Sequence, residues 1–275
     1  MTLMHDRYLS DKPWGQPSNA ETFHHYHGAG LFNSMLSQSP MPHEEKDAMW
    51  AAAALLGAIT LASIDSTNAE ACWPLAPSSP SDLSWLRMSD GKKEVWRLAD
   101  PLREGSVWRP ALQHQANDEP PYQAHPAEME SLVPCLIRLY NFDEAATGEG
   151  DPYHTATSII IRLLPIRCSH STILYFLSFL GHMDPAYRQL LHQKDPKAIL
   201  LLAWWYATML DYTSGWWLQR RALLECQAIC VKLQRQFVPY TDIGRLLDFP
   251  KSKCGLAVSS EYARLAGQPE SLHRE

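Results

Sequence analysis

This 275-residue chain lacks most of the features that mark a class of protein at first sight. It has no apolar run of the roughly 17–25 residues that a membrane span needs. It also has no N-terminal apolar leader and no N-x-S/T glycosylation site. Its six cysteines are separated by 63, 33, 58, 4 and 24 residues, which fits neither a disulfide framework nor paired C-x-x-C zinc ligands. We therefore expect reduced thiols in an intracellular protein without a membrane span.

Basic clusters are also missing. The net charge is −6, and Lys92-Lys93 and Arg220-Arg221 are pairs rather than patches. A surface that grips a phosphate backbone needs clustered positive charge on one face. We therefore predict no direct DNA contact from this chain.

Common catalytic motifs are absent as well. There is no G-x-S-x-G, H-E-x-x-H or P-loop, and Gly28-Ala-Gly30 has Asn33 where a dinucleotide fingerprint needs its third glycine. Asp143-Glu144 is an acidic pair without the second acidic motif that would help hold Mg²⁺ against a diphosphate. We predict no enzyme, no catalytic residue and no cofactor, and keep a pathway enzyme with an apolar pocket as an alternative.

The clearest signal in the chain predicts a helical hairpin over about 195–236. Asp195-Pro196 is a helix-start signal, because the carboxylate can accept from N–H groups that lack a helical partner and proline loses no hydrogen bond there. Ten apolar residues follow over 198–207, so every face of this helix should leave water. Turn residues at 211–215 then allow a second helix over 216–236 to fold back.

The second helix of the hairpin is amphipathic. Spacings of four, four, three and four place five residues on one face: Leu218, Ala222, Cys226, Ile229 and Leu233. The hairpin thus consists of a fully buried helix and a partner with one wet face.

No alternating strand pattern is convincing, so we predict an all-α fold, a single-domain helical bundle over 1–250 around this hairpin, with a polar, loose tail over 251–275. Further helices are expected over 3–10, 19–37, 44–64, 82–100 with an interruption at Gly91, 128–140, 155–180 with a break at Pro165, 185–195 and 240–247. The proline-rich segment 100–127 is the longest irregular stretch, and a loop of that length is either functional or disordered.

Aromatic residues gather near the hairpin and supply the candidate ligand site. The set is Trp204, Trp205, Tyr206, Trp216 and Trp217 from the hairpin, with Tyr175, Phe176 and Phe179 from the preceding helix. Such a density either fills a core or lines a cavity for an apolar ligand. Core packing is the more common outcome of this pattern, and the two interpretations stay open here.

Two groups of metal-ligating residues are weak candidates. His24, His25 and His27 lie close together, but a zinc site needs three or four ordered ligands, and no cysteine or acidic partner stands at a telling distance. Cys226 and Cys230 share a helix face at i, i+4, yet buried cysteine usually behaves as a small hydrophobe. We predict no metal site.

Five segments together resemble a known family. They are DAMWAAAALLGAITLASI (47–64), DLSWLRMSDGKKEVWRLADPLR (82–103), ILLLAWWYATML (199–210), WWLQRRALLECQAIC (216–230) and LLDFP (246–250). They are similar, in this order, to the C-terminal regulatory domain of fungal zinc-cluster (Zn2Cys6) transcription factors. The sterol-uptake-regulator type looks most similar. The likeness runs from about Leu3 to Pro250.

The resemblance implies a helical domain that regulates transcription by binding a hydrophobic small molecule, sterol in the best-known members. It implies a nuclear location, with a cytosolic one when ligand is bound. The DNA-reading module of such factors needs six closely spaced cysteines, whereas those here are dispersed. We therefore expect either a fragment of a longer factor or a stand-alone regulatory domain. The alternative is a ligand-free interaction domain, which forms a homodimer or binds a transcriptional co-regulator.

Overall fold

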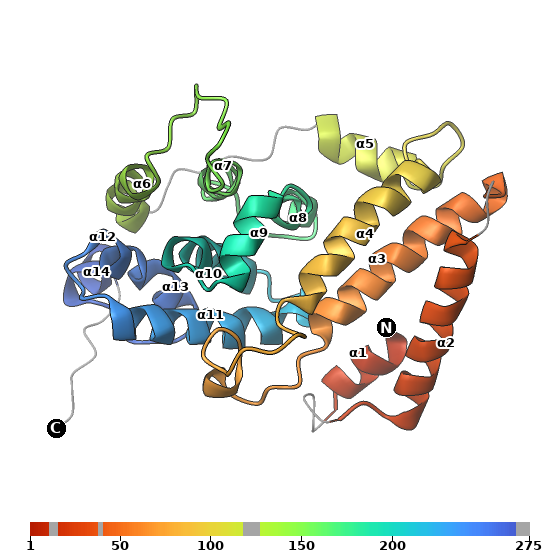
Figure 1. Ribbon diagram of the computed structural model, residues 1–275, viewed down its shortest axis with the longest axis horizontal. Coiled ribbons are helices and arrows are strands. Elements are labelled where there is room, and N and C mark those ends of the chain that lie inside the picture. Colours follow the sequence, from red (N-terminus) through yellow and green to blue (C-terminus); the bar gives the residue numbers. More distant parts are fainter. Residues whose placement is uncertain (11–15, 38–40, 118–126, 268–275) are drawn as a thin grey trace. The chain divides into compact units, whose positions relative to one another are not determined.

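The computed structural model describes residues 1–10, 16–37, 41–117 and 127–267. These ranges form α-helices and two short 3-10 helices, with no strand among them, which confirms the predicted all-α class (Figure 1). Residues 11–15 and 38–40, part of the expected irregular segment at 118–126 and the end of the expected tail at 268–275 lie outside the described residues. No helix in the described ranges is both long and apolar enough to cross a membrane.

The described helices divide between two compact units. The first unit comprises 1–67, 84–119 and 216–218, and the second comprises 68–83, 120–215 and 219–275. The prediction of one domain over 1–250 stays a prediction.

The first unit is built on two helices that lie side by side, α3 (Lys46–Ala62) and α4 (Ser84–Ala99) (Figure 1). Helix α4 runs continuously through Gly91, so the predicted interruption is wrong; its packing along α3 outweighs the low helix propensity of glycine. The other helices of this unit are α1 (Thr2–Tyr8), α2 (Asn19–Leu36) and α5 (Arg109–Asn117).

Helix α5 corrects the prediction that 100–127 is irregular. A polar clamp holds the chain that leads into it: Asp47 of α3 accepts from Ser106 Oγ at 2.8 Å and pairs with Arg103 at 2.9 Å. Trp108 Nε1 donates to the Asp47 carbonyl oxygen at 3.1 Å. These contacts join residues about 60 apart in sequence, so local periodicity does not reveal them.

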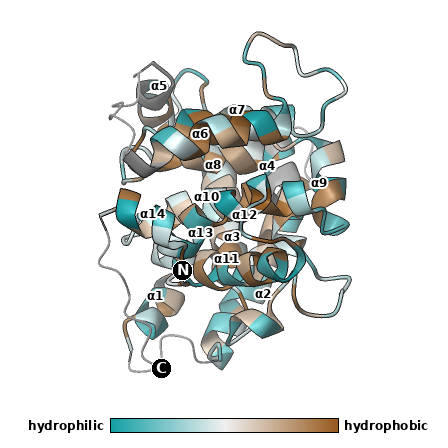
Figure 2. Ribbon diagram, turned by 90° about the vertical axis from the view of Figure 1, so that its left-hand side faces the viewer, coloured by the Kyte–Doolittle hydropathy of each residue, from teal (hydrophilic) through white to brown (hydrophobic). Residues whose placement is uncertain are grey.

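The second unit is organised around α10 (Pro196–Leu210), which fills the predicted position. Every residue from Ala198 to Met209 is buried. The Asp195 carboxylate accepts from the Ala198 N–H at 2.9 Å, which confirms the predicted N-cap. Helix α11 (Trp216–Gln236) follows, and the five residues of its predicted apolar face are at most 1% exposed. Hydrophobic and hydrophilic residues both colour α11 in Figure 2, as its amphipathic sequence requires.

Shorter helices surround α10 within this unit. Helices α7, α8, α9, α12 and α13 all contact it. Their bounds are α6 (Ala127–Tyr140), α7 (His154–Leu163), α8 (Ile173–Gly181), α9 (Pro185–His192), α12 (Asp242–Leu246), α13 (Asp248–Lys253) and α14 (Ser260–Leu265). The break expected at Pro165 is confirmed, because α7 ends two residues before it.

The predicted loose tail is wrong for its described part. Residues 251–253 belong to α13, and α14 follows with Tyr262 buried. Asp248 holds this segment in place, because its carboxylate accepts from the Ser259 N–H at 3.0 Å and from Ser259 Oγ at 2.6 Å. The hydroxyl of Ser259 in turn caps α14 by accepting from the Tyr262 N–H.

Candidate functional site

The three consecutive aromatic residues of α10 lie in the core of the second unit. Trp204, Trp205 and Tyr206 are 0% exposed. Trp204 Nε1 donates to the Leu246 carbonyl oxygen at 2.9 Å, and Trp205 Nε1 donates to the Phe176 carbonyl oxygen at 2.8 Å. Their polar atoms are thus satisfied by the protein itself, as buried polar groups usually are.

The aromatic residues of α8 are divided between this core and the surface. Phe176 and Phe179 are buried, and the Phe179 ring stacks on Trp205 with centroids 5.6 Å apart and an interplanar angle of 15°. Tyr175, one turn before Phe179 on α8, is half-buried. Trp205 therefore contacts the Phe179 ring and the Phe176 carbonyl, while Tyr175 remains partly exposed.

Trp216 and Trp217 begin α11 and are half-buried. Both belong to the first unit. There the Trp216 ring lies 5.1 Å from His5 and 5.6 Å from Tyr8, centroid to centroid. These two tryptophans thus pack in a different unit from the other six predicted ligand contacts.

A pocket of about 410 Å³ opens between α7 and α8 in the second unit. Of the eight predicted ligand residues, Tyr175 is among those that line it. The lining residues are His154, Thr155, Ser158, Ile159, Arg162, Leu163, Ile166, Tyr175, Ser178 and His182. This volume falls within the range of about 300–1,000 Å³ that is usual for small-molecule sites.

Helical spacing explains why α7 contributes so many of these residues. His154, Thr155, Ser158, Ile159 and Arg162 recur at intervals of one, three, one and three, so they share one face of the helix. The opposite face carries Ile160, which is fully buried and belongs to the core. One face of α7 thus supplies packing and the other is left for a ligand.

Hydrogen bonds to backbone oxygens orient both histidines of the pocket. His154 Nε2 donates to the Asp143 carbonyl at 3.1 Å, and His182 Nδ1 donates to the Ser178 carbonyl at 2.9 Å. The second ring nitrogen of His182 is thereby left to act on a ligand, whereas Nδ1 of His154 lies against Gly148.

The pocket combines a cationic rim with an apolar side. Arg162 is exposed, and no carboxylate among the described residues pairs with it. Leu163 and Ile166 are buried and Ile159 half-buried, which gives an apolar surface beside the guanidinium. An arginine of this kind can take a carboxylate, sulfate or phosphate in a bidentate hydrogen-bonded pair.

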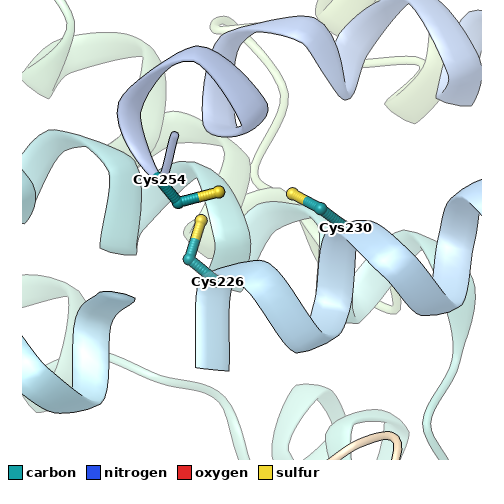
Figure 3. A group of neighbouring side chains, drawn as sticks. All are labelled: Cys226, Cys230 and Cys254. Carbon is teal, nitrogen blue, oxygen red and sulfur yellow. The ribbon is translucent and has the colours of Figure 1, made fainter. Parts of the chain in front are cut away.

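A second cluster of chemistry-bearing side chains gathers Cys226, Cys230 and Cys254. Their sulfur atoms lie within 4.8 Å of one another, and all three residues are buried (Figure 3). Burial raises the pKa of Cys226 and Cys230. Hydrogen bonds from those two thiols lower the pKa of Cys254 to about 4. The sequence indicated Cys226 and Cys230 as small hydrophobic residues. This prediction did not include Cys254, which lies 24 residues after Cys230 and joins them in the structure.

The histidine group of α2 has no comparable neighbourhood. His24, His25 and His27 are exposed, and the described residues do not bring a cysteine or carboxylate to them in a group of three ligands.

For the α7–α8 pocket, the only signal in the sequence was the segment HTATSIIIR (154–162), which has a polar face and an apolar face. This pattern indicates an amphipathic helix, but it does not indicate which helix packs beside it.

Comparisons with protein-family models, with curated proteins and with solved structures give no match to this chain.

Proposed function

We propose that this chain is a ligand-responsive regulatory domain of the fungal zinc-cluster transcription-factor type, and that its ligand binds in the α7–α8 pocket. The proposal draws on the resemblance of its five segments to that family for the class of protein. The observation that carries the site is the pocket of about 410 Å³ with Arg162 on its rim. In this proposal the domain acts in the nucleus, without catalysis, and leaves DNA contact to another chain segment or partner.

The lining favours an amphipathic organic anion as the ligand. Ile159, Leu163 and Ile166 can bury an apolar body, at roughly 25 cal/mol per Å² of apolar surface removed from water. Arg162 can pair with an acidic head group, and charge-assisted hydrogen bonds contribute about 1.5–3 kcal/mol each. A sterol that carries a sulfate ester combines both features, whereas a neutral sterol leaves the guanidinium unused.

Binding of cholesteryl sulfate, measured by fluorescence competition below its aggregation concentration, tests the proposal. Wild-type chain should bind it at least about tenfold more tightly than cholesterol, equivalent to about 1.4 kcal/mol. Arg162→Gln should remove this preference. Arg264→Gln serves as the matched control, because Arg264 is exposed in the same unit and does not line the pocket. Equal affinity of all three proteins for both sterols would contradict the proposed site.

The surface of α2 favours a second candidate function, a self-association domain. Phe23, Tyr26 and Leu31 are 58%, 77% and 68% exposed and lie on one side of this helix. Exposed apolar residues gathered on one helix face are typical of protein interfaces. Sedimentation equilibrium would show a dimer that Phe23→Ser with Leu31→Ser converts to monomer. A wild-type monomer at high concentration would rule this function out.

A further inference from the structure

Cys226, Cys230 and Cys254 form a group in the second unit, where the end of α13 lies against α11. Cys226 and Cys230 project from successive turns of α11, and Cys254 directly follows the last residue of α13 (Figure 3). The three residues are 0%, 0% and 2% exposed, and none forms a disulfide. Their sulfur atoms lie within 4.8 Å of one another.

Two hydrogen bonds that do not involve sulfur hold the end of α13 against α11. The Cys254 N–H donates to the Pro250 carbonyl at 3.0 Å and closes the end of α13. Gln227 of α11 donates through Nε2 to the Cys254 carbonyl at 2.8 Å, which ties the two helices together. The backbone at Cys254 is therefore held beside α11 before any ligand arrives.

The spacing suits one metal ion. A sulfur-bound zinc ion has metal–sulfur distances of about 2.3 Å, which puts neighbouring sulfurs about 3.8 Å apart in a tetrahedron. The observed upper limit of 4.8 Å is close enough for rotation about the Cα–Cβ bonds to complete the contraction. Thiolates select soft ions, chiefly Cu(I), zinc and the iron of iron–sulfur clusters.

The number of sulfur ligands and the burial of the three cysteines distinguish among these ions. A structural zinc site takes four protein ligands, and a three-ligand zinc site keeps an open position for water. Among the described residues no histidine, carboxylate or fourth cysteine joins the three sulfurs, and burial leaves them no contact with bulk water. Both facts favour an ion that is stable with three soft ligands. Lys251, which acts electrostatically on Cys230, offsets part of the charge.

We propose that Cys226, Cys230 and Cys254 bind one Cu(I) ion as three thiolates. Binding forms three copper–sulfur bonds and releases to solvent whichever thiol protons remain, with no change of oxidation state. Gly255, directly after Cys254, is exposed, so the site lies one residue from solvent and an ion can enter by opening the end of α13. This site is separate from the α7–α8 pocket and stands or falls independently of it.

The test is an anaerobic titration of the reduced full chain with Cu(I) held by the chelator bicinchoninate. We expect one Cu(I) per chain to leave the chelator, and X-ray absorption to show sulfur-only, three-coordinate copper. Cys254→Ser should lower the affinity at least about 100-fold. Cys168→Ser is the matched control, because Cys168 is also buried and free but lies outside the group.

Circular dichroism of the metal-free variants separates lost ligation from lost folding. Cys230→Ala, which places a good helix former in α11, replaces Cys254→Ser if the latter melts. The proposal is overturned if the chain takes no copper from the chelator, or if Cys168→Ser loses as much affinity as the site variants. It is equally overturned if the purified chain holds four-coordinate zinc that stoichiometric Cu(I) does not displace.

Discussion

Tyr206 of α10 donates a hydrogen bond to Glu225 of α11, with 2.5 Å between the phenol oxygen and Oε2. Arg221, one turn before Glu225, donates to the other carboxylate oxygen. All three side chains are buried, so this polar group joins the two helices of the hairpin in the core. Burial raises the pKa of Glu225, and the hydrogen bonds from Arg221 and Tyr206 partly oppose that rise.

Tyr206→Phe should lower the free energy of unfolding by about 1.5–3 kcal/mol at pH 7, because the Glu225 carboxylate, which pairs with Arg221, loses a donor. The folded pKa of Glu225 lies above its unfolded value, so the unfolded chain releases this proton first. The contribution of Glu225 to the free energy of unfolding therefore falls as the pH rises from the pKa of Glu225 in the unfolded chain to its higher pKa in the folded chain. Without the Tyr206 hydroxyl the folded pKa rises further, and the loss should be larger at pH 7 than at pH 4 in urea unfolding.

Tyr187→Phe is the control for that pH dependence. Tyr187 is also fully buried, and its hydroxyl donates to the Ala198 carbonyl at 2.8 Å. Its loss should cost about 0.5–1.5 kcal/mol, nearly equal at pH 4 and pH 7, because a carbonyl does not titrate. The same pH dependence in both variants would show that Glu225 is not its source.

Trp205→Phe should destabilise the chain by about 2–4 kcal/mol, since it opens a cavity against Phe179 and removes the indole hydrogen bond to the Phe176 carbonyl. Binding of cholesteryl sulfate should be unchanged, because Trp205 does not line the pocket. Thermal melts and binding isotherms of the same preparation measure both quantities. Weaker binding by a variant that melts like wild type would instead place ligand at the aromatic core.

Two glycine-to-alanine changes should have opposite effects. A Cβ on Gly57 of α3 would meet the end of the flexible Lys92 side chain, 2.6 Å from Cε, which can move away. Alanine should therefore leave stability unchanged or raise it by up to about 1 kcal/mol. A Cβ on Gly244 of α12 would meet backbone atoms, the Val238 carbonyl oxygen and Pro239 Cα at 2.8 Å.

Since that backbone cannot move without disturbing α12, Gly244→Ala should cost about 1–3 kcal/mol. Urea unfolding of the two variants side by side gives the comparison. A loss from Gly57→Ala as large as that from Gly244→Ala would mean that Lys92 is held more rigidly than its aliphatic chain implies.

Asp195→Ala should lower stability by about 1–2 kcal/mol, because the carboxylate caps α10 and also accepts from the Tyr153 hydroxyl at 2.9 Å. Asp195→Asn keeps an acceptor oxygen and should recover most of this loss. Asp184→Ala removes the cap of the shorter helix α9 and should cost less. Hydrogen exchange of the first turn of α10 should rise in Asp195→Ala, and unchanged exchange there would contradict the capping role.

The sequence predicted the elements whose signals are local. Asp195-Pro196 and the apolar run after it predicted α10, and spacings of three and four predicted the buried face of α11. The sequence did not predict α5, because hydrogen bonds to Asp47 position the chain that leads into this helix. It did not predict α14, because the start of that helix depends on the hydrogen bond between Ser259 and Asp248. Both depend on contacts that no short window contains.

The candidate sites were predictable to a smaller extent for the same reason. Tyr175 was named from aromatic density, but Arg162 and His154 become neighbours of Tyr175 only when α7 packs beside α8. Cys226 and Cys230 were visible as an i, i+4 pair, whereas Cys254 reaches them only through the packing of α13. The fully apolar α10 also hid which of its aromatic rings were core, because every face of it is buried.

The most direct test of the α7–α8 site is an NMR titration with cholesteryl sulfate, in which the isoleucine δ1 methyl groups carry ¹³C. Ile159 and Ile166 line the pocket, and Ile199 and Ile229 lie in the hairpin core. We expect saturable shifts of the Ile159 and Ile166 methyls, with those of Ile199 and Ile229 unchanged. Shifts confined to Ile199 and Ile229, or the same shifts in Arg162→Gln as in wild type, would contradict the proposed site.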